Sequence, residues 1–203
     1  MSTQLLIATK NLGKVREYRD LLADLPFHVV SLADVGVDAD VEETGATFEE
    51  NAVLKARTYA RLSGLLTWAD DSGLAVDALG GWPGVHSARA AGPDATDMDR
   101  IRLLLNRLQD APPDRRSAAF HCVVAIAAPD GRVWTTEGSC SGVIIDEPTG
   151  QGGFGYDPVF FVPSLGKTFA QLTRDEKNAI SHRGIAARKA KGLLARLAAA
   201  GEI

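Results

Sequence analysis

The sequence lacks the features of proteins that are secreted, stabilised by zinc or embedded in a membrane. It has only two cysteines, Cys122 and Cys140, and neither belongs to a pair at the usual spacing of zinc ligands. We expect free thiols, as is usual in a reducing cytosol. No apolar run approaches the ~20 residues of a membrane span, and residues 1–12 lack the pattern of a secretory signal. We therefore expect a cytoplasmic protein with no membrane partner.

A basic excess is also missing. The chain has 22 Lys and Arg against 26 Asp and Glu, a net charge of −4. Proteins that grip long nucleic acids usually carry net positive charge, so we expect no nucleic-acid partner. A nucleotide remains a possible ligand because it needs only a local positive pocket. The length fits one large domain over residues 1–203, or two lobes that share a core.

The order of predicted elements indicates the fold class. Strands are predicted at 4–9, 27–32 and 65–69, helices after Asn11, from Thr47 to about Leu62, after Thr96 and from about Thr173, and a hairpin at 118–128 and 132–145. Strands and helices alternate early and the hairpin comes late. That order predicts an α/β fold with a mixed central sheet.

The first candidate site follows the first strand. A turn between a strand and a helix exposes N–H groups where the helix dipole favours an anion. Here the turn adds a hydroxyl, an amide and two lysines: Thr9, Lys10, Asn11, Leu12, Gly13 and Lys14. This is no Walker A loop. The segment predicts either a phosphate site or an ordinary Asn-capped helix with solvated lysines.

The second candidate is acidic. Asp70 and Asp71 should end the strand at 65–69, and ligands of open α/β sheets bind beyond the carboxyl ends of strands. Glu42 and Glu43 precede the second helix. Mg²⁺ takes one or two carboxylates plus phosphate oxygens and water, and a second acid can orient or deprotonate water. The alternative is a set of solvated turn residues.

Two later segments supply groups suited to a base. In Gly152–Pro158, glycines allow close approach of the backbone, and Phe154 and Tyr156 can stack on a base while Asp157 accepts hydrogen bonds. Lys177, His182 and Arg183 are donors suited to a carbonyl or phosphate oxygen. The alternatives are a loop that covers the core and a charged helical face.

Taken together, these segments resemble the inosine/xanthosine triphosphate pyrophosphatase family. The matching text is Thr-x-Asn-x-Gly-Lys at 9–14, Glu-Glu-Thr-Gly at 42–45, Phe-x-Glu-Asn-Ala at 48–52, Ala-Asp-Asp-Ser-Gly-Leu at 69–74, Gly-Gly-Phe-Gly-Tyr-Asp-Pro at 152–158 and Ser-His-Arg-Gly at 181–184. The resemblance covers nearly the whole chain. One departure is Lys10, where the family often has glycine.

The resemblance implies a two-lobed α/β fold with an active-site cleft between the lobes, and a homodimer. It implies Mg²⁺-dependent hydrolysis of inosine, deoxyinosine and xanthosine triphosphates to monophosphate and pyrophosphate, which removes deaminated purines from the nucleotide pool. Residues 9–14 would bind phosphate, and Glu42 or Glu43 with Asp71 would hold the metal. Asp71 would accept the proton, with Asp70 beside it. Substrate would also contact Ser72, Phe154, Gly155, Tyr156, Asp157, Lys177, His182 and Arg183.

Donors at His182 and Arg183 suit this base preference. Inosine and xanthosine carry an acceptor at O6, whereas adenosine carries a donor there, and an unpaired buried donor costs ~1–3 kcal/mol. Guanine also has O6, so these donors do not reject it.

Three other functions compete. A Maf-type pyrophosphatase with a different base preference would share the early phosphate loop but would not need the late aromatic and Ser-His-Arg segments. A nucleotide-binding module without catalysis could discard its acids, yet all four are present. An RNA-binding module is disfavoured by the net charge.

Overall fold

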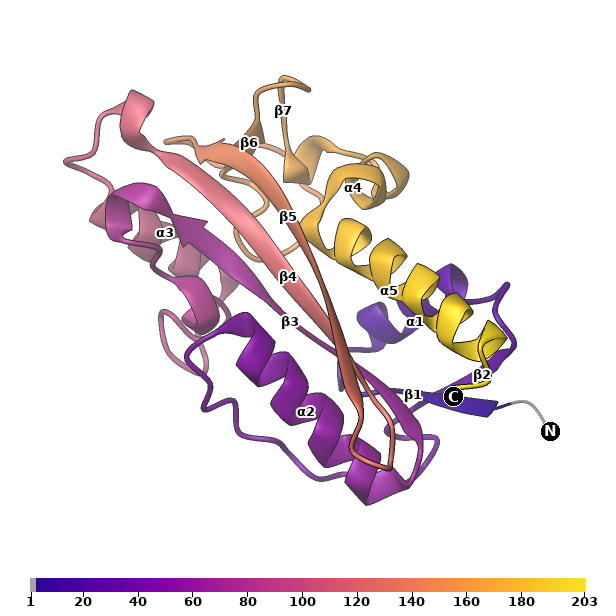
Figure 1. Ribbon diagram of the computed structural model, residues 1–203. Helices are drawn as coiled ribbons and strands as arrows, with labels where there is room; N and C mark the ends of the chain where they lie inside the picture. The colour runs from indigo at the N-terminus through magenta and orange to yellow at the C-terminus, as the bar shows by residue number, and fades with distance from the viewer. Residues whose placement is uncertain (1–2) are drawn as a thin grey trace. The chain divides into compact units, whose positions relative to one another are not determined.

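A computed structural model describes residues 3–203 of the chain (Figure 1). Its strands are β1 (Thr3–Ile7), β2 (Phe27–Ser31), β3 (Leu66–Val76), β4 (Ser117–Ala127), β5 (Val133–Ile144), β6 (Phe160–Val162) and β7 (Lys167–Thr168). Its α-helices are α1 (Leu12–Leu21), α2 (Phe48–Ser63), α3 (Asp97–Arg107), α4 (Arg174–Ile180) and α5 (His182–Ala199).

The strands form one mixed sheet in the order β2-β1-β3-β4-β5-β6-β7. β1 pairs in parallel with β2 and β3, whereas β5, β6 and β7 pair antiparallel. The α/β class with a mixed sheet, predicted from the sequence, is thereby confirmed. Residue contacts divide the chain into two compact units, and the long strands β3, β4 and β5 contribute residues to both. The first unit holds residues up to Asp71 with 122–138 and 185–203, and the second holds 72–121 with 139–184.

The first unit is a three-layer sandwich because β1 alternates its buried side chains between two faces. Leu5 and Ile7 pack in one apolar cluster with residues of α1 and α5, such as Val15 and Ala190. Leu6 packs in another cluster with Ala52 and Ala56 of α2. Successive side chains of a strand point to opposite faces, so one short strand serves two cores. Figure 1 accordingly shows α2 on one side of β1 and β3, and α1 and α5 on the other.

The second unit has its own apolar core. Leu74 and Val76 of β3 lie in it with the inner face of α3 and an aromatic group from β4, β6 and the segment after β7. The rings of Phe120 and Phe169 are stacked with centroids 5.6 Å apart. Phe160 contacts both of them at 4.7 and 4.8 Å. These packed rings form the aromatic part of the second unit's core.

Local sequence signals set the helix ends. Thr47 and Glu50 form the predicted capping box, in which each side chain accepts from the other's backbone N–H at the start of α2. Gly64 then ends α2 in the left-handed conformation, at φ 70°, which glycine adopts without steric cost.

The structure corrects three sequence predictions. The strand predicted to stop at Asp70 continues to Val76, because Leu74 and Val76 are fully buried and the two carboxylates have partners within the fold. The last helical segment is broken at Ser181, which is extended (ψ 152°) and whose Oγ accepts the Gly184 N–H at 3.1 Å, so it caps α5. β6 and β7 were not predicted because they are too short to show a pattern.

Among residues 3–203, no helix is long and apolar enough to cross a membrane.

Neighbouring leucines of α3 offer a test of the second core. Leu104 is fully buried and Leu105 only partly. We expect Leu104→Ala to lower the free energy of unfolding by about 2–5 kcal/mol, because it leaves a cavity in a packed core. Leu105→Ala is the matched control and should cost distinctly less. Urea denaturation of both variants measures the difference, and equal losses would contradict this description of the core.

Candidate active site

The segment from Thr9 to Lys14 leaves the carboxyl end of β1 and begins α1. Asn11 caps the helix as predicted, and its Oδ1 accepts the N–H groups of Gly13 and Lys14 at 2.9 and 3.2 Å. Thr9 Oγ1 in turn accepts the Asn11 N–H at 3.2 Å. Two amides at the helix N-terminus are therefore already satisfied by the protein. The groups that the loop offers to an anion are the side chains of Thr9 and Asn11, the lysines and the helix dipole.

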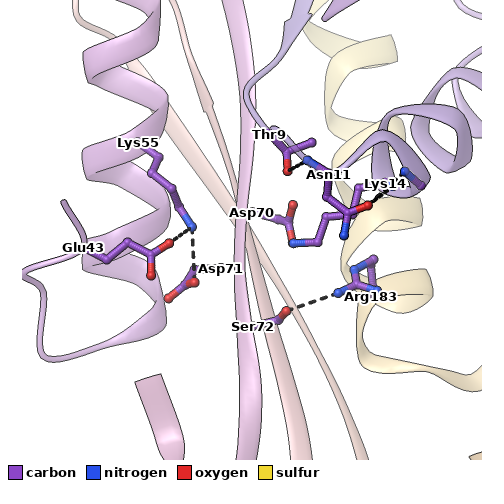
Figure 2. Close-up of polar contacts among 10 residues, drawn as sticks. Thr9, Asn11, Lys14, Glu43, Lys55, Asp70, Asp71, Ser72 and Arg183 are labelled. Carbon is purple, nitrogen blue, oxygen red and sulfur yellow. Dashed lines mark hydrogen bonds and ion pairs between the residues drawn. The ribbon is translucent and has the colours of Figure 1, made fainter. Parts of the chain in front are cut away.

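Lys14 forms a largely buried ion pair with Asp70. Its Nζ lies 2.6 Å from Asp70 Oδ2, and the side chains are 20% and 2% exposed. Asp70 therefore does not face open solvent, as a surface turn residue would. The ion pair fixes the lysine of the loop beside β3 (Figure 2).

Asp71 points the opposite way, toward α2. Lys55 Nζ of α2 lies 3.2 Å from Asp71 Oδ1 and 2.6 Å from Glu43 Oε1. Asn51, one turn earlier on α2, donates from Nδ2 to Asp71 Oδ2 at 3.2 Å. Glu43 and Asp71 thus converge on one cationic group, and Figure 2 shows both side chains directed at Lys55.

Burial and charge act in opposite directions at this cluster. Burial raises the pKa of Asp71 above its ordinary value, because Lys55 only partly offsets the loss of water and Glu43 repels the charge. Burial alone would lower the pKa of Lys55, but the attraction of Asp71, Asp70 and Glu43 raises it. Lys55 therefore stays charged, and Asp71 is a better proton acceptor than an ordinary carboxylate.

Three other candidates in the first unit, Glu42, Lys10 and Leu12, are exposed. Glu42 is exposed, whereas Glu43 is half-buried beside Lys55. Lys10 pairs with Asp40 at 2.8 Å and with Asp38 at 3.5 Å. Leu12 is 68% exposed. Of the predicted acidic residues, the structure brings Glu43 and Asp71 together on Lys55.

In the second unit, Ser72 follows Asp71 directly along β3. Its Oγ accepts from Arg183 Nη2 at 3.4 Å (Figure 2). Arg183 stands in the first turn of α5, and its guanidinium carbon lies 5.3 Å from the centroid of the Phe154 ring. Ser72, Arg183 and Phe154, which the sequence predicted as substrate contacts, therefore lie close together.

Lys177 also lies against the Phe154 ring, 4.7 Å from its centroid, and it forms an ion pair with Asp157. The Asp157 side chain is only 3% exposed, and its Oδ2 also accepts the Phe154 N–H at 2.9 Å. The Phe154 ring itself is 54% exposed. An exposed aromatic face flanked by two cations suits a flat, electron-rich ligand such as a base.

Two predicted contact residues prove to be parts of the core. Tyr156 is 3% exposed and donates from its hydroxyl to the Ser87 carbonyl oxygen at 3.0 Å. Burial raises its pKa to about 12, so it stays a neutral donor. Its side chain does not offer a face for stacking, contrary to the sequence prediction. His182 is 5% exposed, and its ring stacks on Phe120 with centroids 4.7 Å apart.

Sequence reasoning missed Asn51 and Lys55. Both lie on α2 behind the capping box, at i and i+4, which places them on one face of the helix. Asn51 belongs to the Phe-x-Glu-Asn-Ala motif at 48–52, but the motif does not indicate that Asn51 bonds to Asp71. An asparagine four residues before a lysine, near the start of a capped helix, was the available signal.

Comparison with known proteins points to one family. Residues 5–193 match the sequence profile of the Ham1 family. The chain is 57% identical over 183 residues to a dITP/XTP pyrophosphatase of Shigella flexneri, covering 89% of this chain and 92% of that protein. It is 51% identical over 194 residues to one from Desulforamulus reducens, covering 96% of each.

Solved structures agree. A HAM1 protein from Coxiella burnetii superposes with a TM-score of 0.90 at 44% identity, over 95% of this chain and 98% of that one. A protein from Mycobacterium abscessus described as a nucleoside-triphosphatase / dITP/XTP pyrophosphatase gives 0.80 at 45% identity, over 92% and 98% of the two chains.

We expect Lys55→Met to destabilise the protein by about 3–5 kcal/mol, because it leaves two carboxylates close together without their buried cation. The matched control is Lys191→Met, which removes a lysine paired with the exposed Asp24 at 2.5 Å and should cost less than about 1 kcal/mol. Urea denaturation without divalent cations measures both. Equal and small losses would mean that Lys55 does not hold the two carboxylates.

Proposed function

The chain belongs to the Ham1 family, and we propose that it hydrolyses deaminated purine nucleoside triphosphates, those of inosine, deoxyinosine and xanthosine, to monophosphate and pyrophosphate. The observation that carries the proposal is the pair of adjacent buried carboxylates, Asp70 and Asp71, each held by a lysine from a different helix. Relatives at 51–57% identity carry the name dITP/XTP pyrophosphatase.

The residues present fit a divalent cation. Glu43 and Asp71 both lie within 3.2 Å of Lys55 Nζ, so two carboxylate oxygens already converge on one positive charge. Mg²⁺ needs only one or two carboxylates when phosphate oxygens and water complete its shell. We therefore assign Glu43, rather than the exposed Glu42, and Asp71 as the residues that would hold Mg²⁺. When bound, the ion would neutralise phosphate charge and acidify water.

The other groups of the first unit have separate tasks. Hydrolysis at phosphorus needs neutralised charge and an aligned water more than a covalent nucleophile. Lys14, held by Asp70, supplies positive charge to the phosphates, and Thr9 and Asn11 contact their oxygens. Asp71 accepts the proton of the attacking water, and Asn51 and Lys55 hold its carboxylate in place for that task. Asp70 thus acts by positioning Lys14.

The second unit supplies the contacts to the base. Phe154 offers its exposed face for stacking, and Arg183 donates to an acceptor such as O6 of inosine or xanthosine. Asp157, held by Lys177, accepts from a ring N–H. His182 stays a base contact predicted from the sequence, since its ring is buried against Phe120. The homodimer, the cytoplasmic location and the lack of a nucleic-acid partner stay predictions from the sequence.

The products of inosine triphosphate test the reaction directly. We expect stoichiometric monophosphate and pyrophosphate on ion-exchange chromatography, formed with Mg²⁺ and not in the presence of a chelator. Asp71→Asn should lower the rate on the order of 10²–10⁴-fold, because the amide neither accepts a proton usefully nor neutralises a metal. Inosine diphosphate and phosphate as products would refute the proposal, and the absence of turnover would favour a module that only binds nucleotides.

Adjacent glutamates separate the metal ligand from its neighbour. Glu43→Gln should raise the Mg²⁺ concentration needed for half-maximal activity at least about tenfold, because it removes one of two charged ligands. Glu42→Gln should leave that concentration within about twofold, since Glu42 is exposed. Activity titrations with Mg²⁺ measure both variants. The reverse ranking would transfer the assignment to Glu42.

A further inference from the structure

Asp97 anchors the loop that carries Phe154 from outside the loop, together with Ala170, Ser87 and Lys177. Asp97 is the first residue of α3, and its Oδ2 accepts the Gly155 N–H at 2.7 Å across 58 residues of sequence. Gly155 lies between Phe154 and Tyr156 and adopts φ 60°, a conformation that favours glycine. The hydrogen bond therefore acts on the backbone directly beside the exposed Phe154 ring.

The carboxylate of Asp97 is itself held in place. Its Oδ1 accepts from Arg100 Nη2 at 2.8 Å, and Arg100 Nη1 donates to the Ala95 carbonyl oxygen at 2.6 Å. Arg100 thereby fixes the side-chain rotamer, so that Oδ2 faces Gly155. A hydrogen bond to an ionised acceptor is stronger than one between neutral groups.

The opposite side of the loop is held by Asp157. Its Oδ2 accepts the Phe154 N–H at 2.9 Å, and the Asp157 N–H donates to the Phe154 carbonyl oxygen at 3.2 Å. These bonds close a turn, but both lie within the loop. They fix the shape of the turn, whereas the bond to Asp97 ties the backbone between Phe154 and Tyr156 to α3.

We propose that Asp97 is a positioning residue for base recognition, which holds the Phe154 ring in place through the Gly155 N–H. This inference rests on the proposed function, in which Phe154 stacks on the base. Asp97 touches no substrate. Its removal should weaken the binding of ligands that carry a base and leave phosphate binding and the chemical step unchanged.

The test compares Asp97→Ala with two related variants. Asp97→Asn keeps one oxygen acceptor but turns an NH2 group toward either Gly155 or Arg100. Asp99→Ala is the matched control, because Asp99 lies at the same end of α3 and bonds to Thr96 and Arg102 instead of the loop. Asp99→Ala removes a capping-box bond and Asp97→Ala does not. Weakening of the start of α3 should therefore appear at least as strongly in Asp99→Ala, whereas loss of the loop contact appears only in Asp97→Ala.

For Asp97→Ala we expect KM for inosine triphosphate to rise about 5- to 30-fold with kcat within about twofold. The inhibition constant of inosine monophosphate, a product with a base, should rise by a similar factor. That of pyrophosphate, a product without one, should stay unchanged. Asp97→Asn should recover part of the loss, and Asp99→Ala should show none. If Asp97→Ala does not fold, Arg100→Gln, which frees the carboxylate, gives the same comparison with a smaller effect.

Equal weakening of pyrophosphate and inosine monophosphate, or an equal loss in Asp99→Ala, would overturn the role of Asp97. Calorimetric titration with inosine monophosphate keeps this result separate from the proposed function. If the wild-type protein releases no pyrophosphate from inosine triphosphate, the proposed function fails. The role of Asp97 then stands only if wild-type protein binds inosine monophosphate and Asp97→Ala binds it more weakly.

Discussion

Two consecutive carboxylates buried in the middle of a strand are the constraint on which the first unit depends. Removing a carboxylate from water is costly unless a cation and hydrogen bonds replace the water. Asp70 meets this condition through Lys14 of α1, and Asp71 meets it through Lys55 and Asn51 of α2. The same contacts that stabilise the strand place Lys14, the lysine that we propose binds phosphate, beside one acid and Glu43 beside the other. Stability and chemistry therefore use the same residues.

The second unit solves a different problem, the display of one aromatic ring on a fixed loop. A Cβ at residue 153 would lie 2.0 Å from Asp157 Oδ2, so glycine is required there for the carboxylate to reach the loop's backbone. Tyr156 and the Phe120–Phe169 stack belong to the packed core of this unit. Phe154 itself remains exposed, whereas its neighbours Tyr156 and Asp157 are buried. Gly150, Gly152 and Gly153 thus allow close packing, whereas Gly155 serves a backbone conformation with positive φ.

The sequence predicted the mixed α/β class, the capped helices and the motif positions, because periodicity, capping boxes and family motifs are local signals. It did not predict that β3 runs through Asp70 and Asp71, since two acids followed by Ser72-Gly73 resemble a turn and their partners lie 56 and 16 residues away. Lys55 and Asp97 were missed for the same reason. The sequence predicts that both Phe154 and Tyr156 can stack on a base, because composition does not show which of two aromatic residues in a loop is buried.

The alternation of β3 has a consequence for how this chain can change over generations. Side chains at even positions, Trp68 and Asp70, face the layer of α1 and α5, and those at odd positions, Ala69 and Asp71, face α2. Loss or gain of a single codon between Trp68 and Asp70 would exchange the two carboxylates between the faces. Loss of one residue would bring Asp71 opposite Lys14 and Ser72 opposite Lys55, so that Lys55 would lose its aspartate. This part of β3 can therefore accept a replacement more readily than a change in length.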